Sequence, residues 1–217
     1  MMHTRLILIL DRSGSMRGLE DETIKGFNSM IEAQKKGSGS VNVTAVLFDD
    51  RHEMIYDNID INNIPNLTRE EYYVRGTTAL LDAIGKTIVY TEQGQAADCN
   101  MKADDKTIIV ITTDGMENAS LKYDVKQIRR MIDQKKANGW EFIFLGANMD
   151  AVEEAARLGI GENRAVSYIN DKEGIGKTYA GISRAVTEMR ADPHLGIIGS
   201  EWKKEIEEDY RGRFHER

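Results

Sequence analysis

The apolar positions of this chain alternate between continuous runs of strand length and spaced patterns of helical period. Residues 4–10 (TRLILIL) and 106–113 (KTIIVITT) carry unbroken apolar runs, which are typical of strands buried on both faces of a sheet. Further strands are predicted at 41–48 (VNVTAVLF), at 51–57 (RHEMIYD) as an antiparallel edge strand, at 141–146 (EFIFLG) and at 164–168.

Helical patterns separate these strands. The first has one apolar side, formed by Leu19, Ile24, Phe27, Met30 and Ile31, and it ends near Gly37 and Gly39. Other helices are predicted to begin within 75–88 (RGTTALLDAIGKTI) and to lie at about 122–137, 151–158 and 177–190. The polar stretch 92–105 is interpreted as a mobile loop. Strands that alternate with helices predict an α/β fold with a mainly parallel sheet and helices on both faces.

The length of 217 residues suits one α/β domain, which we expect to span residues 1–191. Residues 192–217 are interpreted as a charged tail, in which 200–210 (SEWKKEIEEDY) is compatible with a surface helix anchored by Trp202. The composition is that of an ordinary globular protein, since 41% of the residues are apolar and 30% are charged.

Charge and cysteine content narrow the function classes. The net charge of −7 argues against binding to nucleic acid or to an anionic membrane. The longest apolar run, Leu6–Leu10, is too short for a membrane span or a signal-peptide core. Cys99 is the single cysteine, so no internal disulfide forms and a reducing compartment fits. We therefore expect a cytoplasmic protein.

Two acidic residues come directly after the two most apolar strands. Asp11 opens the sequence Asp-x-Ser-x-Ser with Ser13 and Ser15, and Asp114 follows KTIIVITT. In open parallel sheets, ligands bind outside the carboxyl ends of the strands, where neighbouring connections diverge. Alternate spacing lets an extended loop turn Asp11, Ser13 and Ser15 toward one point, and such an all-oxygen cluster suits Mg²⁺. Taken alone, each motif is also compatible with a capped helix start or a tight turn.

A third motif lies within 75–88, where a threonine precedes a helix. Asp-x-Ser-x-Ser after the first strand, this threonine, and Thr-Asp-Gly after a later strand together resemble the von Willebrand factor type A (VWA) domain family with a metal-ion-dependent adhesion site (MIDAS). The family pattern Gly-Gly-Thr-x-Leu-x-x-Ala-Leu is matched by Thr78, Leu80, Ala83 and Ile84, whereas Thr77 replaces the second glycine. The register favours Thr78 over Thr77 as the ligand. The resemblance covers residues 4–190.

The resemblance implies a doubly wound, Rossmann-like sheet of six strands in the order 3-2-1-4-5-6, with one antiparallel edge strand. It also implies a metal site, whose ligands would be Asp11, Ser13, Ser15, Thr78 and Asp114. Mg²⁺ is the expected cation, with Mn²⁺ and Ca²⁺ as alternatives. An Asp or Glu of an unidentified partner protein would complete the coordination, in a stand-alone domain of bacterial or phage type. The expected function is cation-dependent protein binding without catalysis.

Two other functions are left open. A metal-dependent hydrolase or phosphatase would use the same cluster, although no His or Lys lies within the three motifs to act as a base. A structural component of a larger assembly would use the cation only to stabilise its fold.

Several other residues are interpreted as unrelated to the site. The sequence GIGKT (174–178) resembles the end of a phosphate-binding loop, but Asp171 stands where that motif needs a glycine. We therefore expect a turn leading into a helix there, and no bound nucleotide. Glu117 and the pair Lys135-Lys136 are expected on solvated surfaces. The four histidines lack the spacing of zinc ligands, and Cys99 has no activating neighbour in the sequence.

Overall fold

The computed structural model describes residues 3–97, 105–147, 149–191 and 199–214, and a six-stranded sheet lies at its centre. The strands are β1 (His3–Asp11), β2 (Ser40–Phe48), β3 (His52–Asp60), β4 (Lys106–Thr113), β5 (Trp140–Ala147) and β6 (Ala165–Tyr168). Their order is β3-β2-β1-β4-β5-β6, in which β2 and β3 pair antiparallel and all other neighbours pair parallel. The predicted fold class and strand order are confirmed.

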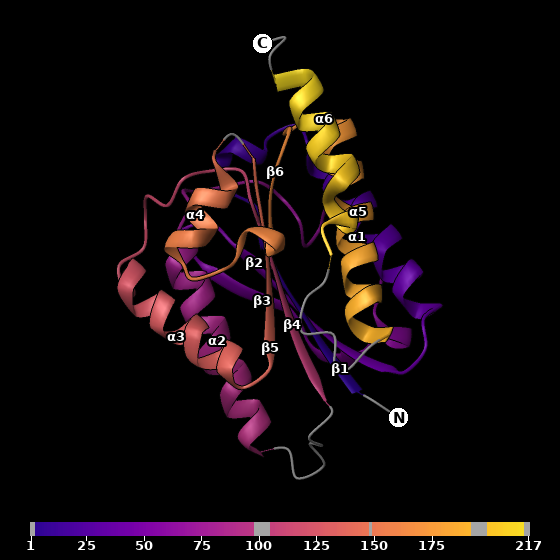
Figure 1. The fold of residues 1–217 in the computed structure, drawn as a ribbon, viewed down its shortest axis with the longest axis vertical. Helices are drawn as coiled ribbons and strands as arrows, with labels where there is room; N and C mark the ends of the chain where they lie inside the picture. Colours follow the sequence, from indigo (N-terminus) through magenta and orange to yellow (C-terminus); the bar gives the residue numbers. More distant parts are fainter. Residues whose placement is uncertain (1–2, 98–104, 148, 192–198, 215–217) are drawn as a thin grey trace.

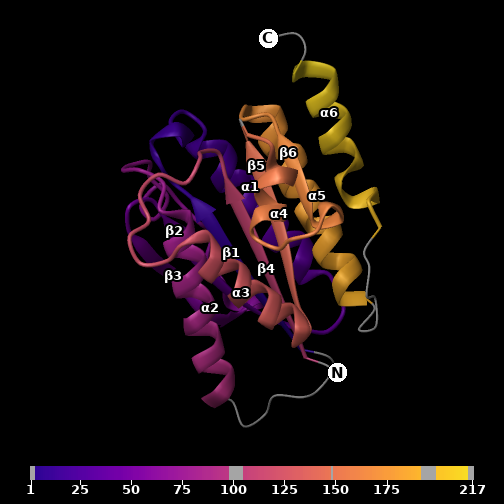
Figure 2. The same cartoon turned by 60° about the vertical axis from the view of Figure 1, so that its left-hand side comes forward.

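Helices cover both faces of the sheet and give the molecule three layers (Figure 1). α1 (Glu20–Lys35) and α5 (Lys172–Ala191) lie on one face, and α2 (Leu80–Ala97), α3 (Val125–Ala137) and α4 (Ala151–Arg157) lie on the other. Figure 2 shows the same division from a second direction. Short 3₁₀ turns add η1 (Gly14–Met16), η2 (Ile61–Asn63), η3 (Glu162–Arg164) and η4 (Glu201–Lys203).

The side chains of β1 alternate between two hydrophobic cores. Leu6, Leu8 and Leu10 belong to the core beneath α1 and α5, whereas Ile7 and Ile9 belong to the core beneath α2 and α3. All five are almost fully buried. A central strand covered on both faces therefore needs the unbroken apolar run that the sequence shows.

The interpretation of 92–105 as a loop is wrong for its first part, because α2 continues to Ala97. The polar side chains of this last part of α2 form contacts with neighbouring elements. Glu92 forms an ion pair with Lys135, and Gln95 Nε2 donates to Thr107 Oγ1 at 2.6 Å. The polar composition marks a partly exposed helix surface, and residues 98–104, with Cys99, lie outside the described residues.

The expected turn at 174–178 is also wrong, because α5 already begins at Lys172. The side chain of Asp171 accepts a hydrogen bond from the backbone of Gly174 at 2.9 Å, which satisfies a free N–H at the start of the helix. The two glycines in the first turns of α5 weakened the helical pattern there without preventing the helix.

The C-terminal segment adds a last helix, α6 (Lys204–Phe214), which packs against α5 and β6. Trp202, in the preceding turn, is fully buried, and its Nε1 donates to the backbone oxygen of Asn163 at 3.1 Å. A helix anchored by Trp202 is thus present, but it runs from Lys204 to Phe214 and not over 200–210, and it packs on the core. Within the described part of the chain, no helix is long and apolar enough to cross a membrane.

Candidate metal centre

The two predicted acidic ligands meet because their strands are neighbours. β1 and β4 pair in parallel, so both end at the same edge of the sheet. Asp11 is the last residue of β1, and Asp114 directly follows β4. Thr113 Oγ1 donates to Asp11 Oδ2 at 2.7 Å and thereby joins the two strand ends. Both carboxylates are almost fully buried.

The loop after β1 brings two hydroxyl groups to these carboxylates. The backbone N–H of Ser13 donates to Asp11 Oδ1 at 2.7 Å, which curls the loop back on the strand end. The Oγ atoms of Ser13 and Ser15 lie 3.2 Å apart, and Ser15 Oγ donates to Asp114 Oδ1 at 2.6 Å. Ser13 is buried whereas Ser15 is exposed, so the cluster opens to solvent on the serine side.

The third loop contributes Thr78, which the structure separates from Thr77. Thr78 is buried and Thr77 is exposed. A Cβ atom on Gly115 would lie 3.0 Å from Thr78 Oγ1 and 3.6 Å from Ser15 Oγ, so both hydroxyls face the Asp114–Gly115 turn. The side chain and backbone of Asn118 hold Thr78 in place through two hydrogen bonds of 3.0 Å to its backbone. The structure therefore brings together all five predicted residues.

Burial changes the acidity of both carboxyl groups. Burial raises the pKa of Asp11 above its usual value, and the hydrogen bonds from Thr113 and Ser13 oppose this shift. Burial, together with the nearby Asp11 charge, raises the pKa of Asp114 to about 6. The chain thus holds two carboxyl groups that are costly to ionise unless a positive charge lies between them.

Sequence reasoning missed two polar residues that hold the site. One is Thr113, described above. The other is Asn170, which follows β6, and its Nδ2 donates to Asp114 Oδ2 at 2.7 Å. Because β6 is separated from β4 by β5, no local sequence signal connects Asn170 with Asp114.

A buried ion-pair network, which the sequence did not reveal, supports the loops that carry the candidate ligands. Arg12 and Asp49 have fully buried side chains, and Arg12 Nε donates to Asp49 Oδ2 at 2.9 Å. Arg75 Nε donates to the same oxygen at 2.6 Å, and Arg12 Nη2 forms an ion pair with Glu53 at 2.5 Å. The backbone oxygen of Asp49 accepts from Ala79 N at 2.9 Å. This network ties the Asp-x-Ser-x-Ser loop to the loop that carries Thr78.

Glu117 does not lie on a solvated surface as expected. Its Oε2 accepts from the backbone N–H of Leu81 at 2.9 Å, and its Oε1 accepts from Ser120 N at 2.7 Å. The residue therefore caps the N-terminus of α2 and fixes the loop after Asp114.

The expectation of a solvated surface is wrong for Lys135 but holds for Lys136. Lys135 is buried, forms an ion pair with Glu92 and lies 5.3 Å from the centre of the Trp140 ring. Lys136 is exposed, and its Nζ donates to the backbone oxygen of Gly159 at 2.7 Å.

The remaining candidate groups that the structure describes contact residues other than the five predicted ligands. Lys177, in the sequence GIGKT, forms ion pairs with Glu173 and Asp209. His52 Nε2 lies 3.0 Å from Thr87 Oγ1, and His194 and His215 fall outside the described residues. Among the described residues, no three His, Cys, Asp or Glu side chains gather as metal ligands. The candidate site has two carboxylates and three hydroxyls, a hard oxygen donor set that fits Mg²⁺ or a similar cation.

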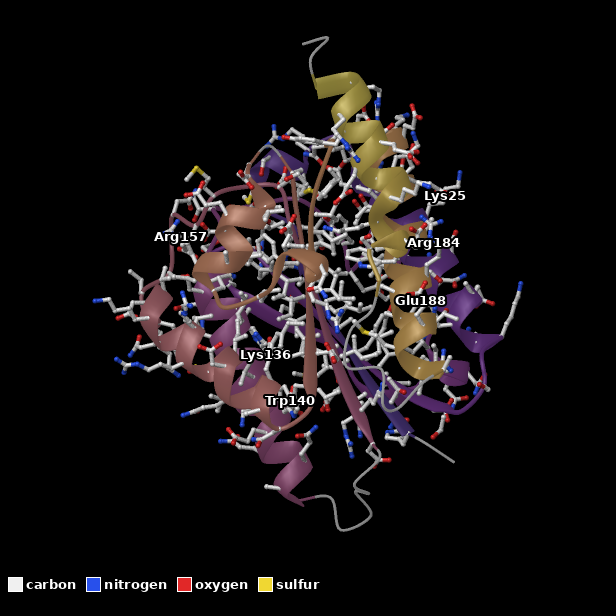
Figure 3. All side chains as sticks on the ribbon, viewed as in Figure 1. Lys25, Lys136, Trp140, Arg157, Arg184 and Glu188 are labelled. Atoms are coloured by element: carbon white, nitrogen blue, oxygen red, sulfur yellow. The ribbon has the colours of Figure 1, made fainter. Side chains whose placement is uncertain are left out.

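A groove between α1 and α5 is separate from the cluster of the five candidate ligands. A groove of about 610 Å³ runs between α1 and α5, and none of the five candidate residues lines it. Lys25, Arg184 and Glu188, which line this groove, lie together beside α1 and α5, to the right of Lys136 and Trp140 (Figure 3). The oxygen cluster thus belongs to the end of the sheet and not to this groove.

Comparisons with known proteins agree with this architecture. A family model described as the von Willebrand factor type A domain matches residues 6–180. No curated protein sequence gave a match.

Several solved structures share the fold. One is proximal thread matrix protein 1 from the mussel byssus with a zinc-occupied MIDAS motif, at a TM-score of 0.60 and 13% identity, covering 86% of this chain and 46% of that one. Another is the vWF domain of the type V pili tip protein Mfa5 from Porphyromonas gingivalis, at a TM-score of 0.63 and 10% identity, covering 86% of this chain and 96% of that one. A third is the PilB minor pilin from Streptococcus sanguinis, at a TM-score of 0.62 and 13% identity, covering 87% of this chain and 62% of that one.

The present chain spans about half the length of the mussel protein. At these identities the likeness concerns the fold. Since the family model matches most of the chain, with its motifs in order at one edge of the sheet, the chain belongs to the von Willebrand factor type A domain family.

Proposed function

We propose that this protein is a cation-dependent protein-binding module. The observation that carries the proposal is the convergence of two buried carboxylates and three hydroxyls, from three separate loops, at an edge of the sheet that opens to solvent at Ser15. Asp11, Ser13, Ser15, Thr78 and Asp114 would hold the cation. The cost of ionising Asp11 and Asp114 side by side favours a bound positive charge.

A bound divalent cation would supply a positive centre able to accept one more carboxylate oxygen, from an Asp or Glu of a partner protein. The chain's own residues orient that centre: Thr113 and Asn170 hold the two carboxylates, and the Arg12–Asp49–Arg75 network holds the loops. Mg²⁺ is proposed because all five donors are oxygens. The zinc-occupied MIDAS of the mussel protein supports a divalent cation at this position in the fold.

Binding is favoured over catalysis by the surroundings of the cluster. Among the described residues, the hydrogen-bond partners of its five side chains include Thr113 and Asn170 but no His or Lys. Hydrolysis needs such a base or a second cation beside the bound water. The cluster also lies outside the groove between α1 and α5, and an exposed edge suits a macromolecular partner better than an enclosed small substrate. We also propose that no nucleotide binds at 174–178 and that the protein is cytoplasmic.

Direct metal titration tests the site. Wild-type protein is expected to bind one Mn²⁺, as a spectroscopic substitute for Mg²⁺, in electron paramagnetic resonance or calorimetry. Asp11→Ala should abolish this binding because it removes a charged ligand. Thr78→Ala should weaken it about tenfold or more, since a neutral ligand is lost. The exposed neighbour offers a matched control, and Thr77→Ala should bind as the wild type does.

The outcomes separate the possible roles. Metal binding that survives Asp11→Ala, or that is lost equally in Thr77→Ala and Thr78→Ala, would place the cation elsewhere. Turnover of a phosphoester that depends on Mn²⁺ and on Asp11 would replace the binding module by a hydrolase. Mn²⁺ binding that raises thermal stability while no protein or peptide binds in a chelator-sensitive way would favour a structural role.

A further inference from the structure

Large apolar side chains are exposed at the edge of the sheet that carries the oxygen cluster. Among the described residues, the large hydrophobic side chains with high exposure are Tyr73, Tyr90, Met116 and Leu121. Tyr90 lies on α2, but the other three lie on the two loops that carry Thr78 and Asp114. Single exposed apolar residues are ordinary, whereas a gathering of them around one site indicates an interaction surface.

Tyr73 lies beside the Asp-x-Ser-x-Ser loop on a rigid support. Its ring centre is 5.2 Å from the guanidinium carbon of Arg12 and 5.5 Å from that of Arg75. The neighbouring Tyr72 donates its hydroxyl to the backbone oxygen of Asp11 at 2.6 Å. With 43% of its surface exposed, Tyr73 presents an anchored aromatic face next to the site.

Met116 and Leu121 lie on the loop that follows Asp114. Met116 follows Gly115, the residue that both Thr78 Oγ1 and Ser15 Oγ face, and it is 71% exposed. Leu121 is 97% exposed, although hydrogen bonds hold the loop on both sides of it. Ser120 Oγ accepts from Asp82 N at 3.0 Å, and Lys122 N donates to Asp82 Oδ1 at 2.9 Å. The side chains of Met116 and Leu121 are therefore exposed on a loop that hydrogen bonds hold in place.

Unpaired positive charge lies at the same edge. Arg17, two residues after Ser15, and Arg51, beside Asp49, are exposed and form no ion pair with the described residues. Each guanidinium group can pair with a carboxylate of a partner, although the exposed acid Asp50 lies beside Arg51 and the whole molecule carries a net charge of −7.

We infer that the partner binds through a segment in which an Asp or Glu stands beside large apolar side chains. This inference rests on the proposed function, because the acidic group is the one that completes the cation's coordination. The apolar neighbours of that residue pack on Tyr73, Met116 and Leu121. Aromatic, methionine and arginine side chains of this kind are enriched in the energetically dominant parts of protein interfaces. The acidic character of the segment complements Arg17 and Arg51.

Peptide selection tests the inference directly. A random peptide library displayed on phage is bound to the full chain in Mg²⁺ and released with EDTA, and the released sequences are read. We expect an Asp or Glu with Leu, Ile, Met or an aromatic residue beside it. The affinity of the most enriched peptide is then measured for variants by fluorescence anisotropy. The double variant Met116→Ser with Leu121→Ser should bind it about tenfold more weakly, because buried apolar surface is lost.

The fourth exposed apolar residue provides the control. Tyr90→Ser should leave peptide affinity unchanged, and all variants should keep wild-type Mn²⁺ binding because none alters a ligand. Two results would overturn this inference and leave the proposed function standing. One is a set of released peptides that share an acidic residue but show no apolar preference, and the other is a peptide affinity that the double substitution does not change. If EDTA releases no enriched peptide, the proposed function and this inference both fail.

Discussion

Arg12 shows how much a single residue of the motif contributes beyond the ligands themselves. It stands between Asp11 and Ser13, where the family pattern accepts any residue, yet its side chain is fully buried between Asp49, Glu53 and the ring of Tyr73. Its Nη1 has no hydrogen-bond partner among the described residues, so the charge depends on a few close contacts. A buried cation of this kind is costly to leave unpaired.

We predict that Arg12→Ala lowers the free energy of unfolding by about 3 kcal/mol, because it leaves Asp49 buried with only the partly exposed Arg75 as an ionic partner. Urea denaturation of the metal-free protein measures this loss.

The exposed ion pair between Arg69 and Asp21 is the matched control. Arg69→Ala should leave the denaturation midpoint unchanged, because solvent screens such a pair. Equal effects of the two substitutions would show that burial of the Arg12 network adds no stability.

At the scale of elements, the C-terminal helix joins the core instead of lying loosely on it. Trp202 and Ile206 belong to the core beneath α1 and α5. Close packing leaves no room for a side chain at Gly181 of α5, where a Cβ atom would lie 2.6 Å from Ile206 Cδ1. Asp209 accepts from both Lys177 of α5 and Arg213 of α6, which aligns the two helices.

Trp202→Ala is predicted to destabilise the fold by about 3–5 kcal/mol, the usual cost of removing a buried tryptophan side chain. Chemical denaturation followed by circular dichroism measures the change. The exposed residue Glu208 on α6 gives the control, and Glu208→Ala should change stability by less than about 0.5 kcal/mol. If Trp202→Ala behaves like Glu208→Ala, α6 does not contribute to the cooperative unit.

In the molecule as a whole, the strand order places two carboxyl groups at one end of the sheet. Because β1 and β4 are parallel neighbours, the chain reversals after them place Asp11 and Asp114 together. Burial raises the pKa of Asp11, and it raises the pKa of Asp114 from 3.8 to about 6. The native state without metal therefore binds protons at a pH where the unfolded chain has already lost them.

We predict that the metal-free protein loses stability as the pH rises from about 4 to about 6, because a raised carboxyl pKa stabilises the native state only while the group is protonated. Thermal unfolding in EDTA across this range measures the slope.

Asp114→Asn should reduce the slope, since one of the two carboxyl groups with a raised pKa is gone. Saturating Mg²⁺ should reverse it, since a bound cation favours the charged carboxylates. A wild-type melting temperature that rises with pH in EDTA would contradict the environment described for Asp114.

Where the signal is local, the residue pattern alone was enough to predict the strands and helices and the residue types at the site. The apolar runs of β1 and β4 predicted buried central strands, and the family resemblance carried by the three motifs implied that Asp11 and Asp114 end neighbouring strands. A local signal was also available for the start of α3, which begins at Val125 and not near 122. Asp124 and Gln127 form a reciprocal capping box there, a pattern readable from residue types three positions apart.

Tertiary structure alone decided which polar residues are buried and which distant groups meet. Arg12, Lys135 and Asp49 carry the same charges as surface residues, and only the packing of separate elements encloses them. Asn170 reaches Asp114 across a strand. Thr78 is buried whereas Thr77 is exposed, because the backbone of Thr78 donates to the side chain of Asn118 and accepts from its backbone, which fixes that loop. Periodicity and capping depend on neighbours within a few residues, whereas burial and pairing depend on contacts between residues far apart in the chain.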